Sequence, residues 1–137
     1  MKLVLDSNVI IAAFAVRGLC HALFEYCLEN HEIYLSHAII EEIKDKLLTK
    51  IKVPKRVVTE IGSFLKINTE VIEPASIDPK FCRDKKDLIV LGTALASNSK
   101  YIITGDDDLL SLKKFKGIKI VTPRSFWKIM KDRGNVR

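Results

Sequence analysis

The chain has 137 residues, of which 47% are hydrophobic, and this length and composition suit one domain with a buried core. Its 23 Lys and Arg against 17 Asp and Glu give a formal net charge of +6, which favours a polyanionic partner such as nucleic acid, although a solvated lysine face explains this balance equally well. The longest apolar run, Val9–Val16, is too short to span a bilayer, and Asp6 interrupts the apolar N-terminus before the core of a signal peptide can form. We therefore expect a cytoplasmic domain formed by residues 1–137, with no membrane contact.

Short apolar runs alternate with helical patterns along the whole chain. In chain order, the expected elements are a strand at 3–5, helices at about 7–16 and 19–30, a strand at 32–35, helices after Ser36 and from Pro54, a strand at 69–72, a loop at 73–83, a helix at about 84–98, a strand at 101–104, a short helix, a strand at 117–121 and a last helix from Pro123. This alternation predicts an α/β fold with a parallel sheet covered by helices on both faces.

Acidic side chains follow two of the predicted strands. Asp6 comes directly after the strand 3–5, and Asp106 comes shortly after the strand 101–104. Because ligands bind at the carboxyl ends of parallel strands, we expect these two side chains to converge at one edge of the sheet. Asp87, in the first turn of its helix, and Glu42, at the border of an apolar helical stripe, are placed where they can join them.

Each acid also has a simpler explanation when it is taken alone. Asp6 and Asp106 can cap helices, Asp84 and Asp87 have the spacing of a capping pair, and Glu42 can pair with Lys46 four residues later. Together, however, several negative charges within a few ångströms destabilise the fold unless a cation neutralises them. Magnesium binds such carboxylates, accepts phosphate oxygens and activates water. The set therefore favours hydrolysis of nucleic acid.

Competing motifs are missing from the sequence. It has neither Gly-x-x-x-x-Gly-Lys-Ser/Thr nor a Gly-x-Gly-x-x-Gly that follows a strand, which argues against nucleotide-binding enzymes of those two classes. Aspartate-based phosphatases usually carry a second Asp two residues after the first, where this chain has Asn8. Cys20, Cys27 and Cys82 are odd in number and lack a Cys-x-x-Cys spacing, which argues against a disulfide framework and a zinc site.

Four segments carry a combined pattern that is more specific than any single acid. They are Leu3-Val-Leu-Asp-Ser-Asn-Val9, Leu35-Ser36 with Ile39-Ile-Glu-Glu-Ile43, Cys82-Arg-Asp-Lys-Lys-Asp87 running on to Ala94, and Tyr101-Ile-Ile-Thr-Gly-Asp-Asp-Asp-Leu109. Together they resemble the motifs of PIN-domain proteins, in particular the VapC-like toxin components of bacterial and archaeal toxin–antitoxin pairs. The resemblance covers nearly the whole chain.

The resemblance implies a three-layer α/β/α sandwich with a parallel sheet of about four or five strands. It also implies a Mg²⁺- or Mn²⁺-dependent endoribonuclease that cleaves single-stranded RNA, is commonly a homodimer, and is blocked by a cognate antitoxin protein. Carried over by position, the catalytic and metal-binding residues are Asp6, Glu42, Asp87 and Asp106, with Asp108 as an outer ligand, and Ser7, Thr104 and Asp84 in supporting positions. Asp87 is favoured over Asp84 as the main ligand because its spacing to Ala94 fits the family's helix.

Two further expectations concern partners. The basic residues Lys113, Lys114, Lys116 and Arg124 follow the Asp106 turn and are candidates for contacts with RNA phosphates, with a solvated face as the alternative. Apolar residues over 57–65 suggest a helix surface that pairs two copies of the chain. The alternative function is a PIN module with weak or no catalysis that binds RNA or a protein partner.

Overall fold

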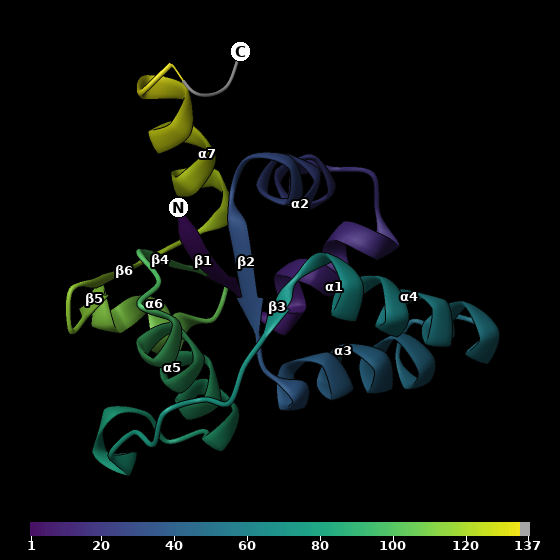
Figure 1. Ribbon diagram of the computed structural model, residues 1–137, viewed down its shortest axis with the longest axis horizontal. Helices are drawn as coiled ribbons and strands as arrows, with labels where there is room; N and C mark the ends of the chain where they lie inside the picture. Colours follow the sequence, from purple (N-terminus) through teal and green to yellow (C-terminus); the bar gives the residue numbers. More distant parts are fainter. Residues whose placement is uncertain (135–137) are drawn as a thin grey trace.

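A six-stranded sheet forms the centre of the molecule, in a computed structural model that describes residues 1–134 (Figure 1). The strands are β1 (Lys2–Leu5), β2 (Glu32–Leu35), β3 (Glu70–Val71), β4 (Tyr101–Ile103), β5 (Lys114–Phe115) and β6 (Ile118–Val121). The helices are α1 (Ser7–Ala15), α2 (Leu19–Asn30), α3 (His37–Thr49), α4 (Lys55–Asn68), α5 (Lys85–Ser97), α6 (Asp107–Leu112) and α7 (Pro123–Asp132), with a short 3₁₀ turn at Pro79–Phe81.

The strand order is β3-β2-β1-β4-β6-β5, and every pair is parallel except β5 with β6. The chain builds the sheet in one direction from β1 to β3 and then in the other direction from β4 to β6. The two central strands, β1 and β4, therefore form the topological switch point, where the loops at the carboxyl ends separate and leave room for a ligand. Asp6 and Thr104 directly follow these two strands.

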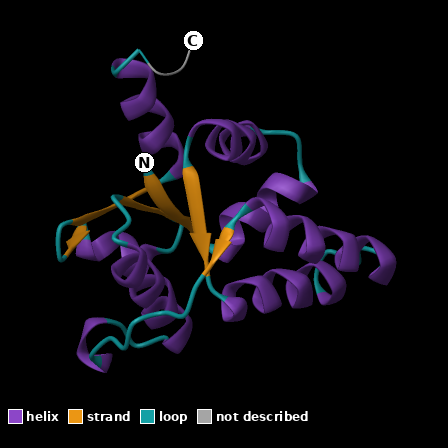
Figure 2. Ribbon diagram, in the orientation of Figure 1, coloured by secondary structure: helices purple, strands orange, loops and turns teal. Residues whose placement is uncertain are grey.

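Helices cover both faces of the sheet, which confirms the α/β/α sandwich. Figures 1 and 2 show α5 and α6 on one side of the strands and α1 to α4 on the other. The central strands are apolar on both faces for this reason: Leu3, Val4, Leu5, Ile102 and Ile103 are completely buried. Helix α7 lies beside α2, where Trp127 meets Tyr26 at a ring distance of 5.7 Å.

The antiparallel edge strand β5 was not predicted from the sequence. It forms a hairpin with β6 in which Phe115 pairs with Ile118. The two residues between them, Lys116 and Gly117, both have positive φ, at 48° and 86°. This is the backbone of the two-residue turn that suits the twist of a hairpin, and it requires Gly or a tolerant residue at both positions. The remainder of the sheet, five parallel strands, agrees with the expected four or five.

The long connection from β3 to α5 is held against α5 by a close backbone contact. The Ala75 amide donates to the Gly92 carbonyl at 2.9 Å, and a Cβ at Gly92 would collide with the Ala75 carbonyl oxygen. Glycine at this position lets the connection cross the helix directly. The crossing fixes the segment that leads into Asp84 and Asp87 at the start of α5.

Among residues 1–134, no single helix combines the length and apolarity needed to cross a membrane. By length and composition alone, α1 and α2 reach that requirement only as a pair, bent by 109° at their junction.

Candidate metal centre

Asp6 and Asp106 meet at the carboxyl edge of the sheet through Thr104. The Thr104 hydroxyl donates to Asp6 Oδ2 at 2.7 Å and accepts from the Asp106 amide at 2.9 Å. The Ser7 hydroxyl lies 3.4 Å from Asp6 Oδ1, and the Asp6 amide donates to the Ile103 carbonyl at 2.9 Å. Thr104 thus links the Asp6 carboxylate to the backbone of Asp106, and the Asp106 charge is close enough to raise the pKa of Asp6. Asp6, Ser7 and Thr104 are all buried.

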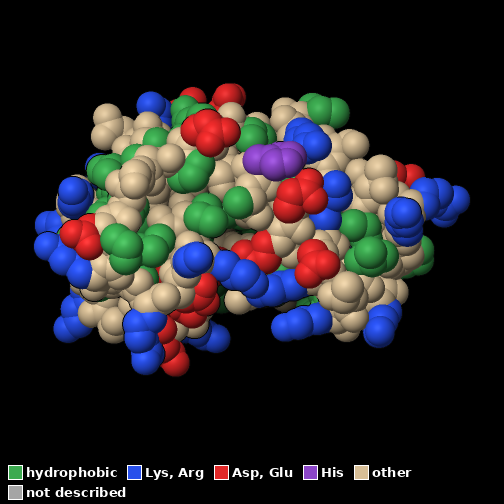
Figure 3. Space-filling view, turned by 90° about the horizontal axis from the view of Figure 1, so that it is seen from below, with side chains coloured by type: hydrophobic (Ala, Val, Ile, Leu, Met, Phe, Trp, Pro, Cys, Tyr) green, Lys and Arg blue, Asp and Glu red, His purple; other side chains and the backbone are tan. Residues whose placement is uncertain are grey.

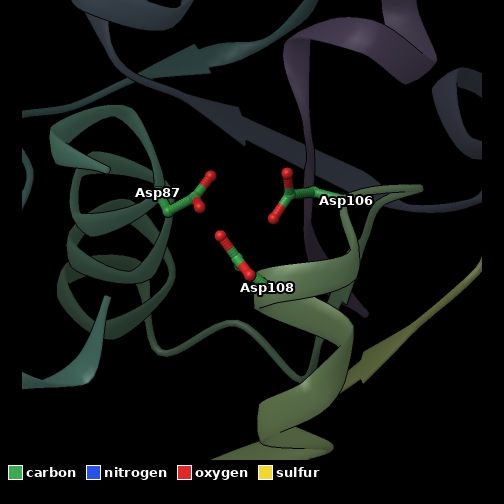
Figure 4. Close-up of side chains that lie close together, drawn as sticks. All are labelled: Asp87, Asp106 and Asp108. Carbon is green, nitrogen blue, oxygen red and sulfur yellow. The ribbon is translucent and has the colours of Figure 1, made fainter. Parts of the chain in front are cut away.

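Three aspartates from two helices face one another across this edge. Asp87 lies in the first turn of α5, Asp106 caps α6, and Asp108 lies in the first turn of α6. Each offers a carboxylate oxygen that lies within 4.8 Å of the oxygens of the other two. In Figure 4 the Asp87 and Asp106 side chains point toward each other, and Asp108 points toward the same space. We call these three residues the aspartate group.

Two carboxyl groups of this site, those of Asp87 and Asp6, have pKa values above that of an ordinary aspartate. The pKa of Asp87 is raised to about 7, first by burial, then by the negative charges of Asp106, Asp84 and Asp6 and by a hydrogen bond with Asp106. The pKa of Asp6 is also raised, chiefly by burial, although the hydrogen bond from Thr104 opposes the rise. The protein places negative charges together without enough positive charge of its own to balance them.

The donor set fits a hard divalent cation. All of the converging ligand atoms are carboxylate oxygens, the type that Mg²⁺ and Mn²⁺ prefer. Asp106 Oδ2 accepts a hydrogen bond from the Leu109 amide at 2.9 Å, which fixes the carboxylate in the cap position. Asp108 is half exposed and lies 3.7 Å from an Arg83 nitrogen. The group is therefore partly open to solvent, as a site that takes up both a metal and a substrate must be.

Glu42 does not lie in the aspartate group. Its Oε1 is 2.8 Å from Lys46 Nζ and 3.7 Å from Lys86 Nζ, and Lys46 also donates to Asn8 Oδ1 at 3.2 Å. The simpler explanation given above, a pair with Lys46 along α3, is therefore realised. Glu42 nevertheless lies close enough for its charge to raise the pKa of Asp6. We call Glu42, Lys46 and Lys86 the lysine-paired corner of the site.

Asp84 and Asp87 have different surroundings. The sequence alone did not decide which of the two is the main ligand. Asp84 is exposed and caps α5 by accepting from the Lys86 amide at 2.9 Å, whereas Asp87 is buried and faces Asp106. The exposed Asp107 lies between two members of the aspartate group without belonging to it. Sequence reasoning did not assign Lys86 a role at Glu42, because only the three-dimensional packing of α5 against α3 brings the two together.

The candidate RNA-binding residues are exposed but divided between the two ends of the sheet. Arg124 follows β6 in the first turn of α7, at the carboxyl edge of the sheet. Lys114 pairs with Lys119 near the start of β6, and Lys116 lies in the turn before β6, so these two lysines lie toward the amino edge. Lys113 lies beside the middle of β6, where its carbonyl accepts from the Ile120 amide. Figure 3 views the carboxyl edge and shows acidic side chains near the middle with Lys and Arg side chains beside them.

A second, more apolar hollow lies away from the carboxylates, where α1, α2 and α4 meet. Its volume is about 280 Å³, and aromatic rings form much of its lining. Phe14 contacts Phe24 and Phe64 there, at ring distances of 5.5 and 6.2 Å. Phe14 and Phe64 remain more than one-third exposed, and Ile67 is 81% exposed on the same helix as Phe64. Surface of this kind is typical of a protein contact.

Comparison with known proteins identifies a protein family and solved structures that share the fold. The PIN domain family matches residues 2–108, a segment that includes every acid discussed above. No curated protein matches the sequence. A solved structure with the same fold is the crystal structure of VapBC2 from Rickettsia felis bound to a DNA fragment from their promoter. It aligns with a TM-score of 0.63 and 16% sequence identity over 89% of this chain and 98% of that chain.

Proposed function

This chain belongs to the PIN domain family, and from that premise we propose that it is a Mg²⁺- or Mn²⁺-dependent endoribonuclease that cleaves single-stranded RNA. PIN domains are generally nucleases. The observation that carries the proposal is the convergence of Asp87, Asp106 and Asp108, whose oxygens lie within 4.8 Å of one another at the switch point of the sheet. The positive net charge of +6 supports a polyanionic substrate.

In this proposal the aspartate group and Asp6 hold the metal. A bound divalent cation supplies an activated water and neutralises charge on the phosphodiester. Thr104 holds the Asp6 carboxylate through one hydrogen bond and the Asp106 backbone through another, so it fixes the spacing between the two strands' acids. The cap bond to the Leu109 amide holds Asp106 in one orientation. These residues keep the ligands in place before the metal and substrate arrive.

Glu42 belongs to the proposed catalytic set through its charge and position, not through direct contact with the aspartate group. Lys46 and Lys86 neutralise it in the described structure. Both ammonium groups lie beside the Glu42 carboxylate, where they can interact with phosphate oxygens of a bound strand. Asp84 supports the site by capping α5 and thereby fixing the first turn that carries Asp87.

We further propose that the chain is the toxin of a toxin–antitoxin pair. Two findings support this: the family, and a fold shared with VapBC2, which was solved bound to a promoter DNA fragment. The exposed apolar surface around Phe14, Phe64 and Ile67 is available for a protein contact, either with an antitoxin or with a second copy of this chain. This surface also favours the second candidate function, a PIN module with weak catalysis that binds a protein partner.

A cleavage assay tests the proposal. The purified chain is incubated with a labelled single-stranded RNA in Mg²⁺, in Mn²⁺ and in excess chelator. We expect cleavage with either metal and none in chelator. Cleavage that persists after metal removal would refute the carboxylate mechanism. Tight binding of RNA or of a partner with no cleavage in either metal would favour the second candidate function.

A further inference from the structure

A small hollow between α3 and α5 adjoins the carboxylates without belonging to the aspartate group. Its volume is about 210 Å³, and its lining consists of Ala38, Ile39, Glu42, Lys86 and Ile89. The walls are apolar, whereas Glu42 and Lys86 place one carboxylate and one ammonium group at the polar end, 3.7 Å apart. Neither the family match nor the structural relative assigns a ligand to this hollow.

The apolar residues of the hollow lie within one helical turn of Glu42 on α3 and of Lys86 on α5. Ala38 and Ile39 precede Glu42 by four and three residues on α3, and Ile89 follows Lys86 by three residues on α5. Residues at these spacings lie on the same face of a helix. Lys86 is also the neighbour of Asp87 in the sequence. The polar end of the hollow is therefore carried by the same first turn of α5 that carries Asp87 of the aspartate group.

We propose that the hollow is a nucleobase subsite that takes one base of the RNA strand, next to the phosphate that reaches the carboxylates. The inference rests on the proposed RNA substrate. A base combines two apolar faces with an edge of hydrogen-bond donors and acceptors, and unpaired RNA presents both to a protein. Ile39 and Ile89 match the faces, while the Glu42 carboxylate accepts and the Lys86 ammonium donates at the edge.

The size and charge of the hollow favour this occupant. At about 210 Å³ it is smaller than the roughly 300 Å³ at which pockets for whole small molecules begin, so it suits a single ring system. Glu42 is paired with two cations, Lys86, which lines the hollow, and Lys46, which lies behind Glu42 on α3 outside the lining. Lys86 is 60% exposed and can reach the phosphate that follows the base. The corner therefore has the net charge that a nucleic-acid strand requires.

The substitution Ala38→Leu tests the subsite by filling it. Ala38 is exposed in the first turn of α3, and Leu is nearly as good a helix former as Ala, so folding should be preserved. The matched control is Ala96→Leu, which adds the same bulk to an exposed position near the end of α5, outside the lining of the hollow. The probe is a fluorescent single-stranded RNA octanucleotide in which one nucleotide at a time is made abasic. Binding is measured by anisotropy in chelator.

In the parent chain and in Ala96→Leu, we expect one abasic position to weaken binding by about fivefold, because the apolar faces of one base lose their burial. In Ala38→Leu the same abasic position should cost nothing further, since the filled hollow no longer takes a base. An equal loss in parent and Ala38→Leu, or no position-specific loss in the parent, would overturn the subsite. Failure to bind any oligonucleotide would overturn both the subsite and the RNA substrate. Position-specific binding without cleavage in Mn²⁺ would support the subsite and refute only the nuclease.

Discussion

Two neighbouring parts of the same sheet edge differ in how the charge of their carboxylates is balanced. In the aspartate group, Asp87, Asp106 and Asp108 face one another, and an Arg83 nitrogen lies 3.7 Å from Asp108 at the exposed side. In the lysine-paired corner, Glu42 has two ammonium groups within 3.7 Å. The first part leaves negative charge unbalanced, whereas the second balances it with the protein's own side chains.

This difference separates two tasks that one acidic cluster would otherwise have to share. Unbalanced carboxylates raise one another's pKa and create a demand for a divalent cation. A carboxylate paired with lysines makes little demand for metal, but its lysines are available to a phosphate that displaces them. We therefore expect metal binding to depend mostly on the aspartate group and substrate binding to depend mostly on the lysine-paired corner.

The largest effect is expected from Asp87→Asn. Asn keeps the shape of the side chain but is a poor metal ligand, so cleavage should fall by about 100-fold or more, beyond the loss typical of residues that merely support a metal ligand. Without metal, the variant should be at least as stable as the parent, because a buried charge has been removed from a repulsive group. With saturating Mn²⁺ the parent alone should gain stability.

Asp107→Asn is the matched control for this experiment. Asp107 is exposed and lies between two members of the aspartate group in the sequence. Its substitution by Asn removes the same formal charge as Asp87→Asn. We expect near-parental cleavage and a near-parental Mn²⁺-dependent shift in melting temperature. If Asp87→Asn cleaved RNA as fast as Asp107→Asn, the aspartate group would not be the metal site.

The unbalanced charge also predicts how stability changes with pH in the absence of metal. The folded chain keeps a proton on Asp87 up to about pH 7, whereas the unfolded chain releases it near an ordinary Asp pKa of about 4. The stabilisation from this proton is complete below about pH 4 and is lost as the pH rises through about 7. Denaturant melts between pH 4 and 8 should show a larger fall for the parent than for Asp87→Asn. Parallel curves would show that Asp87 keeps an ordinary pKa.

A smaller effect is expected when the link between the two strands is cut. Thr104→Val keeps the branched shape but removes the hydroxyl that joins Asp6 to the Asp106 amide. Loss of such a supporting bond typically costs 10- to 100-fold in metal affinity or activity, so we expect a loss of about tenfold in both. Thr104→Ser should restore most of it because the hydroxyl returns. A Ser variant as weak as Val would indicate that packing, rather than the hydrogen bond, is responsible.

Glu42→Gln tests whether the lysine-paired corner serves substrate binding rather than metal binding. The family resemblance assigns Glu42 to the metal, whereas the structure pairs it with Lys46 and Lys86. We expect the Mn²⁺ dissociation constant to change by less than about threefold, since the aspartate group remains, while the RNA dissociation constant falls because two lysines are freed. The measurements are Mn²⁺ titration by melting temperature and RNA binding in chelator. A loss of metal affinity equal to that of Asp87→Asn would place Glu42 among the direct ligands.

Patterns that depend on neighbours in the chain predicted much of this molecule. Asp6 and Asp106 were placed together because each follows a central parallel strand, and that relation is fixed by topology. The pairing of Lys86 with Glu42 was not predictable in the same way, because it depends on how α5 packs against α3 over a separation of 44 positions. The β5–β6 hairpin was missed because it has only two paired residues on one strand and a Lys-Gly turn in place of the more familiar Asn-Gly.

The smallest effect is expected from the lysines at the far end of the sheet. Lys114 and Lys116 lie toward the amino edge and Lys113 beside the middle of β6, whereas the aspartate group and Arg124 lie at the carboxyl edge. A short RNA that fills only the catalytic edge cannot reach all of them, but a long one can. For a long single strand, each phosphate contact contributes about 0.7 to the slope of log affinity against log salt.

Changing all three lysines to Gln should therefore reduce that slope by up to about 2 for a long RNA and leave a tetranucleotide unaffected. Arg124→Gln, at the near edge, should change the slope for both lengths by about 0.7. If the triple variant had the parental slope for long RNA, these lysines would be a solvated face, and RNA contacts would be confined to the carboxyl edge.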